Sequence, residues 1–156
     1  MAINKYRTKI EVDLTPVYHD RAPEITYGID QADQTKVLTE PYTLSFDLEL
    51  DQGPHDLIIN LTNKTNEDCI PSQNLDMLVT ISEVRFSGIA LQRFILISEY
   101  TPTYPEPWYS NLDVKPDAVL YSRNTLGWNG TWKIPFKTPI FPWIHDIEKM
   151  GWIWPI

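Results

Sequence analysis

Aromatic side chains in a proline-rich stretch are the residues whose type most clearly suggests binding. Tyr104, Trp108 and Tyr109 lie within residues 101–116, which include four prolines. Flat aromatic faces pack against the C–H groups of sugar rings, and neighbouring prolines reduce the ordering cost of binding. Together with Trp128, these residues predict a carbohydrate-binding platform. The alternative is that Trp108 and its neighbours only cover one end of a hydrophobic core.

A polar loop offers oxygen atoms that suit a hard cation. Asn63 and Asp68 lie within residues 62–74, and Asp76 follows shortly after. Calcium takes six to eight oxygen ligands in flexible geometry, so these three residues predict a calcium site. No EF-hand spacing is present, and acidic loop residues that are simply hydrated are the alternative.

The C-terminal segment is unusually rich in tryptophan. Trp143, Trp152 and Trp154 are accompanied by isoleucine and proline up to the last residue. An apolar end of this kind is rarely left in water. It is expected either to pack back over the domain or to bind another subunit, and both alternatives stay open.

Sequence signatures of enzymes are missing. There is no strained serine elbow, no phosphate-cradling glycine loop and no zinc-protease helix. Cys69 is the only cysteine, which rules out an intrachain disulfide and a zinc site built on cysteines. His19, His55 and His145 each precede an aspartate, but catalytic partners meet through the fold and not as chain neighbours. We predict a protein that is not an enzyme, although paired carboxylates for glycoside hydrolysis stay open.

The acidic composition narrows the range of partners. The 156-residue chain has a formal net charge of −8 and no cluster of lysine and arginine. Nucleic acid and anionic membrane surfaces are therefore unfavourable partners, because both attract clustered positive charge. No apolar targeting segment opens the chain, so synthesis in a cytoplasm is expected.

Alternating apolar residues predict strands along most of the chain. From Tyr42 to Asp51 every second residue is apolar, and the alternation resumes at residues 57–61, so these two runs are predicted to pair as a hairpin. A change of parity after Ile81 predicts a β-bulge near Ser82 and Glu83. Further strands are predicted at residues 9–18, 25–29, 75–81, 89–100, 118–121 and 128–136.

Helix signals are confined to residues 142–150, where Pro142 suits the first helical position and Gly151 suits the position after the helix end. Many short strands separated by turn residues favour an all-β fold. We predict a single domain over residues 1–156, an antiparallel, jelly-roll-like β-sandwich with one short C-terminal helix. A closed barrel is the structural alternative.

Two segments resemble proteins of large contractile-tailed bacteriophages. They are Tyr-Thr-Pro-Thr-Tyr-Pro-Glu-Pro-Trp at residues 100–108 and Leu-Gly-Trp-Asn-Gly-Thr-Trp at residues 126–132, the latter followed by Phe136 and Trp143. The likeness spans residues 56–147 and is to small uncharacterised β-sandwich proteins. It implies a virion location, with other virion proteins or further copies of the chain as partners.

A second stretch, residues 76–88, is similar in spacing to a strand motif of calcium-dependent xylan-binding modules. Asp76 falls on the aspartate of that motif, Lys64 stands where the motif has an acid, and Leu78 replaces an asparagine. The apolar positions of the motif are matched by Val79, Ile81, Val84 and Phe86. This resemblance implies glycan binding, with calcium as a cofactor.

The leading hypothesis from sequence is a phage virion component that acts by binding other proteins through Trp143, Trp152 and Trp154. The alternative is a module that binds a host-surface polysaccharide, with or without calcium.

Overall fold

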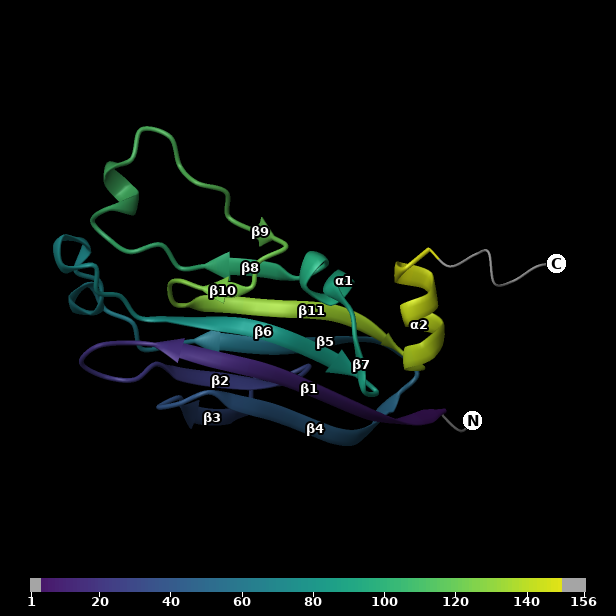
Figure 1. The fold of residues 1–156 in the computed structure, drawn as a ribbon. Coiled ribbons are helices and arrows are strands. Elements are labelled where there is room, and N and C mark those ends of the chain that lie inside the picture. The colour runs from purple at the N-terminus through teal and green to yellow at the C-terminus, as the bar shows by residue number, and fades with distance from the viewer. Residues whose placement is uncertain (1–3, 150–156) are drawn as a thin grey trace.

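The computed structural model describes residues 4–149, which form two antiparallel β-sheets packed face to face with a helix at one end (Figure 1). The first sheet has the order β10 (Thr125–Leu126), β6 (Leu78–Phe86), β1 (Lys5–Val17) and β4 (Tyr42–Asp51), with β7 (Ile89–Ala90) also paired to β6. The second has the order β3 (Gln34–Val37), β2 (Glu24–Ile29), β5 (Gly53–Leu61), β11 (Gly130–Thr138), β8 (Glu99–Pro102) and β9 (Leu120–Tyr121). The helices are α1 (Gln92–Leu96) and α2 (Ile140–Ile147).

The core lies between the two sheets and is built by the alternation seen in the sequence. In β1, Ile10 and Val12 are fully buried, and in β5 the same is true of Leu57 and Ile59. Residues between them face outward, because successive side chains of a strand point to opposite sides. The predicted sandwich is confirmed, and the two separate sheets are not a closed barrel.

The predicted hairpin between residues 42–51 and 57–61 is wrong. β4 pairs with β1 in one sheet, whereas β5 pairs with β11 and β2 in the other. The chain crosses between the layers at Gln52 and Gly53, where Gly53 has a positive φ of 125° that favours glycine. The Thr138 hydroxyl donates to the Asp51 carbonyl at 2.6 Å and holds this corner. Alternation predicts strands, but it does not say to which sheet each strand belongs.

The predicted bulge is confirmed. Asp13 of β1 faces Glu83 of β6 and Leu14 faces Ile81, so Ser82 is the extra residue. The extra residue shifts the alternation of β6 by one position, which is why Val84 faces the core as Ile81 does, although the two are three residues apart.

The prediction of a single strand over residues 89–100 is wrong, because a helix interrupts the segment. That run forms β7, then α1, then β8, with Phe94 of α1 buried in the core. A short apolar run does not distinguish a buried strand from a buried helix.

The predicted C-terminal helix is present as α2 but begins at Ile140, so Pro142 lies in its first turn, where main-chain N–H groups need no helical partner. The predicted stop at Gly151 lies outside the described residues.

The long connections gather at one end of the sandwich and α2 lies at the other (Figure 1). The first end has the loop after β5, with the 3₁₀ turns Asn66–Asp68 and Pro71–Gln73, and the proline-rich loop with the turn Tyr109–Asn111. We call these the loop end and the helix end.

Candidate functional site

The loop end contains an open cleft with aromatic walls. Trp108 of the proline-rich loop and Trp128 of the β10–β11 loop both line it, and its volume is about 450 Å³. Trp108 is 49% exposed, which is high for so large an apolar side chain. The other lining residues are Asn66, Cys69, Pro71 and Pro105.

The proline-rich loop is held in shape by its own aromatic side chains. The ring of Tyr104 stacks on that of Tyr109 with centroids 5.4 Å apart, and Trp108 lies 6.0 Å from Tyr104. The Tyr104 hydroxyl donates to the Asp117 carbonyl at 2.7 Å. Of the four predicted glycan-binding residues, Trp108 and Trp128 thus meet in one cleft. Tyr104 and Tyr109 are neighbours of Trp108 and do not line the cleft.

The main chain of Trp128 is fixed by a buried tyrosine. The Tyr100 hydroxyl of β8 donates to the Trp128 carbonyl and accepts from the Trp128 N–H at 3.1 Å. Burial raises the pKa of Tyr100 to about 12, so the hydroxyl keeps the proton that it donates at neutral pH. Gly130 lets the strands come this close, because a Cβ there would lie 2.4 Å from the Thr101 carbonyl oxygen.

The side chain of Trp128 is fixed by a buried lysine. The Lys64 ammonium lies 4.2 Å from the centroid of the Trp128 ring, and its side chain is only 1% exposed. The same nitrogen donates to an Asp76 carboxylate oxygen and to the Gly127 carbonyl, each at 2.5 Å. Cation–π contact strengthens when the cation is shielded from water.

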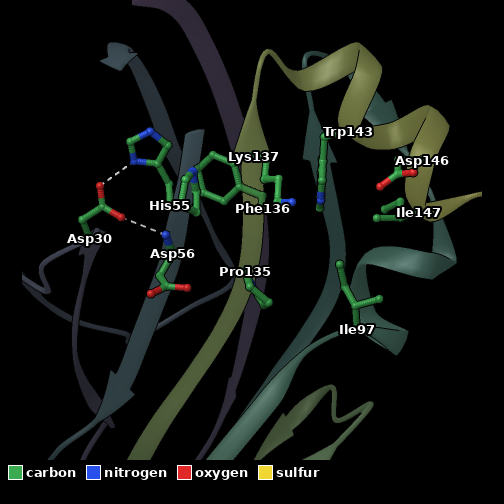
Figure 2. Close-up of a pocket in the computed structure, with 11 residues that line it drawn as sticks. Asp30, His55, Asp56, Ile97, Pro135, Phe136, Lys137, Trp143, Asp146 and Ile147 are labelled. Carbon is green, nitrogen blue, oxygen red and sulfur yellow. Dashed lines mark hydrogen bonds and ion pairs between the residues drawn. The ribbon is translucent and has the colours of Figure 1, made fainter. Parts of the chain in front are cut away.

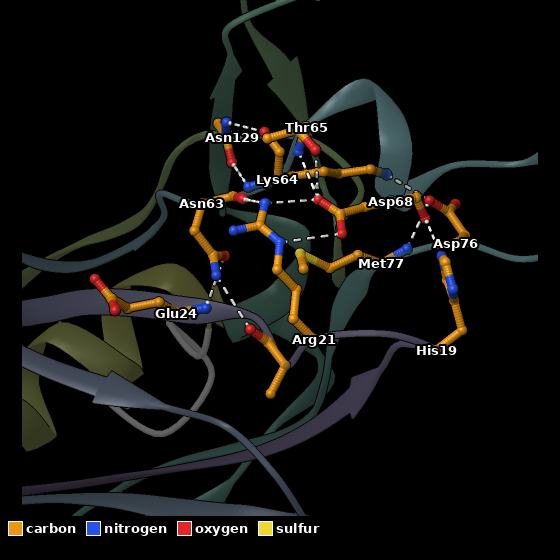
Figure 3. A network of polar contacts seen from close by, with 11 residues as sticks. His19, Arg21, Glu24, Asn63, Lys64, Thr65, Asp68, Asp76, Met77 and Asn129 are labelled. Carbon is orange, nitrogen blue, oxygen red and sulfur yellow. Dashed lines mark hydrogen bonds and ion pairs between the residues drawn. The ribbon is translucent and has the colours of Figure 1, made fainter.

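Asparagine side chains tie the neighbouring main chain together (Figure 3). Asn129 accepts from the Lys64 N–H and donates to the Lys64 carbonyl, both at 2.8 Å. Asn63 accepts from the Glu24 N–H at 2.8 Å and donates to the Ala22 carbonyl at 3.1 Å. Its amide oxygen, predicted to be a metal ligand, therefore already has a protein donor.

Asp68 is the buried carboxylate of a second ion pair at the loop end (Figure 3). Arg21 donates to its carboxylate at 2.9 Å, and the Thr65 N–H donates at 2.7 Å. Burial by itself would raise the pKa of Asp68, but the hydrogen bonds from Arg21 and Thr65 outweigh it and hold that pKa below its ordinary value. Asp68 is thus an ionised carboxylate paired with a permanent cation.

The helix end has a larger cavity of about 550 Å³ (Figure 2). Its apolar wall includes Phe136 and Trp143, and its polar rim includes His55 and Asp30. The two ring nitrogens of His55 lie 2.6 Å from an Asp30 carboxylate oxygen and 2.6 Å from the Asp51 carbonyl oxygen. Both neighbours are acceptors, so this geometry suits a doubly protonated imidazolium.

Trp143, predicted to contact a partner, lies mainly in the core. It is 7% exposed, its ring stacks on Phe94 at 5.6 Å, and it also contacts Phe86 and Phe136. The apolar face of α2 covers this end of the sandwich, so little of the Trp143 ring is exposed. Partner binding through Trp143 stays a prediction. Trp152 and Trp154 lie outside the described residues.

Sequence reasoning missed several residues of the loop end. Cys69, Pro71 and the packing of Lys64 under Trp128 have no local signal, since each depends on a segment far away in the chain. Asn66, in the polar loop of residues 62–74, was not predicted to bind sugar, yet it lines the cleft and donates to the Glu106 carbonyl at 3.4 Å.

Comparison with known proteins yields a structural likeness. No family profile and no curated protein matches the chain. A solved structure, the selenomethionine form of the module vCBM60, matches with a TM-score of 0.51 and 15% identity, covering 81% of this chain and 89% of that one. Its description links two families of calcium-dependent carbohydrate-binding modules through circular permutation. At this identity the likeness supports the sandwich fold.

These comparisons do not support the phage resemblance, a virion location or virion partners. The structural neighbour is described as a carbohydrate-binding module, the class of the alternative hypothesis, and at 15% identity it shows the fold alone. Among the helices of residues 4–149, none has the length and apolar character needed to cross a membrane.

The residues at the loop end do not fit the calcium ion that the structural neighbour suggests. Asn63, Asp68 and Asp76 were predicted to bind it, but their oxygens accept from Glu24, from Arg21 and from Lys64. Within residues 4–149, no three or more His, Cys, Asp or Glu side chains are grouped so that they could hold a metal. Calcium binding by these oxygens would compete with the hydrogen bonds that Arg21 and Lys64 donate.

Proposed function

We propose that this chain is a carbohydrate-binding module and that the cleft between Trp108 and Trp128 is its binding site. The observation that carries the proposal is the pair of tryptophans from two separate loops lining one open cleft, with Trp108 half exposed. The structural neighbour, itself a carbohydrate-binding module, supports it through the fold. In this proposal the chain binds sugar and does not cleave it.

The chemistry of the cleft suits a neutral sugar chain. The indole of Trp108 presents an apolar face for the C–H side of a pyranose ring, and the Asn66 amide at the cleft offers polar atoms to its hydroxyls. The net charge of −8 disfavours polyanionic polysaccharides, because like charges repel along the approach. Neutral glycans are therefore the expected ligands.

Affinity electrophoresis in gels containing a neutral polysaccharide tests the proposal. We expect the wild-type chain to be retarded by at least one of xylan, glucomannan, mixed-linkage β-glucan or galactan. Trp108→Ala should weaken that binding by about tenfold or more, because a central aromatic contact often contributes about 2 kcal/mol.

Phe141→Ala is the matched control. Phe141 is 61% exposed on α2, at the helix end, so its removal deletes an exposed aromatic ring far from the cleft. It should leave retardation unchanged. Equal loss in both variants, or no retardation of the wild type by any of these polysaccharides, would refute the proposal.

A further inference from the structure

The contacts of Lys64 are those of a bound cation. An ammonium group has three N–H donors, and the structure gives this one three partners: the Asp76 carboxylate, the Gly127 carbonyl and the face of the Trp128 ring. The Lys64 side chain is 1% exposed, whereas Asp76 is 40% exposed. The positive charge is therefore the buried member of the pair, and its neighbours are two hydrogen-bond acceptors and one aromatic face.

These partners come from three separate parts of the chain. Lys64 follows β5, Asp76 precedes β6, and Gly127 with Trp128 forms the loop between β10 and β11. A buried charge is costly unless it is fully paired, so the segments that supply its acceptors are held at fixed positions around it. A structural metal ion also fixes loop segments in this way, because it binds oxygen ligands from several segments at one point.

Lys64 also connects this cluster to the cleft. Its ammonium lies over the ring of Trp128, but Lys64 is not among the residues that line the cleft. The lysine thus holds one wall from within, while the accessible part of the indole is left for a ligand. Asn129 clamps the main chain of Lys64 to the same loop.

We propose that the Lys64 ammonium is a built-in cation that does the structural work of a metal ion, so that ligand binding at the Trp108–Trp128 cleft is independent of calcium. This inference rests on the proposed function for its ligand. Lys64 is a positioning residue in this scheme, because it acts on the ligand through Trp128. The calcium dependence of the structural neighbour is where the two proteins are expected to differ.

The first measurement is the melting temperature of the wild-type chain in EDTA and in about 1 mM calcium, a level that fills weak extracellular calcium sites. We expect the two values to agree within about 1 °C, because a ligand that does not bind the folded state does not stabilise it. A rise of several degrees with calcium would overturn the proposal. This readout needs no sugar, so it decides the metal question even if the proposed function fails.

The second measurement replaces the Lys64 ammonium by a carboxylate, which can bind an added calcium ion. Lys64→Asp exchanges the cation for a carboxylate and leaves space beside Asp76 and the Gly127 carbonyl for an external ion, and we expect this variant to melt at a higher temperature in calcium than in EDTA. Lys5→Asp is the matched control, since Lys5 forms an exposed pair with Asp51 at 3.4 Å and the charge change is the same. A folded Lys64→Asp protein that responds to calcium no more than Lys5→Asp does would contradict the proposal.

The third measurement links Lys64 to the cleft. Lys64→Met keeps the apolar stem and removes the charge, and we expect its retardation by the bound polysaccharide to fall by about tenfold at a temperature where circular dichroism shows it folded. EDTA should leave the wild-type retardation unchanged. A folded Lys64→Met protein with wild-type retardation would contradict the positioning role. Loss of wild-type retardation in EDTA would contradict metal independence, and no retardation under any condition would refute only the proposed function.

Discussion

The two ends of the sandwich use tryptophan in opposite ways. At the loop end Trp108 is half exposed, and it shares an open cleft with Trp128. At the helix end Trp143 is buried against Phe94 and closes the core. The same residue type thus provides a contact surface at one end and packing at the other, and what decides between them is whether a loop or a helix presents it.

The two ends also differ in the kind of charged residue that each contains. The loop end relies on two ion pairs, Lys64 with Asp76 and Arg21 with Asp68. The helix end relies on His55, whose charge changes near neutral pH. The stability that the His55 contacts contribute should therefore change with pH.

The largest expected effect is at the helix end. Trp143→Ala should lower the free energy of unfolding by about 4 kcal/mol, because it leaves a cavity among Phe86, Phe94 and Phe136. Urea denaturation at fixed temperature measures this loss. Phe141→Ala, two residues earlier on α2 and on its exposed side, should change stability by less than about 0.5 kcal/mol. Similar losses in the two variants would mean that Trp143 is not a core residue.

A smaller effect is expected at the loop end from Tyr100→Phe. The change removes the hydroxyl that bonds both the carbonyl and the N–H of Trp128, and leaving those groups unpaired should cost about 2 kcal/mol. Retardation by polysaccharide should also weaken, because one wall of the cleft loses its anchor. Tyr121→Phe, on the neighbouring strand β9 and exposed, is the control that should change neither property. Wild-type retardation in a folded Tyr100→Phe protein would show that Trp128 does not need this anchor.

The smallest effect concerns pH. Burial lowers the pKa of His55, but its hydrogen bonds to the Asp51 carbonyl and to Asp30 outweigh this, so the pKa is raised above the ordinary value of 6.5. A raised pKa means that the folded state holds its proton more tightly than the unfolded state does. The stabilisation is therefore complete below about pH 6.5 and is lost as the pH rises through the folded-state pKa.

Chemical denaturation at a series of pH values, with wild type and His55→Gln compared at each, isolates this contribution. The stability difference between the two proteins should shrink as the pH rises above about 6.5. A difference that is constant with pH, or that grows as the pH rises, would contradict the raised pKa.

Alternation along the chain predicted most of the fold, because it reflects which side of a strand faces the core. It placed β4, β5 and the bulge at Ser82 correctly. The alternation of apolar residues failed to predict two features. It did not show that β4 and β5 belong to different sheets, and it did not show that residues 89–100 contain a helix. Both features depend on which other elements a segment packs against in the folded chain, and the pattern within one strand does not contain that information.

The candidate site was only partly predictable. Trp108 was identified from its residue type and the prolines nearby, and Trp128 from its residue type, and the structure places them together. The sequence did not reveal that Lys64 would pair with Asp76, because the partners are twelve residues apart and meet only when β5 and β6 enter different sheets. Trp143 and Trp108 cannot be distinguished by composition, since exposure is a property of the assembled fold.

The most direct test of the central claim, that sugar binds at the loop end, is an NMR titration of the tryptophan indole N–H signals. The probe is an oligosaccharide from the polysaccharide that retards the chain most strongly. We expect the signals of Trp108 and Trp128 to shift, while those of buried Trp132 and Trp143 stay in place. Shifts confined to Trp143, or unchanged Trp108 and Trp128 signals at saturating ligand, would contradict the account.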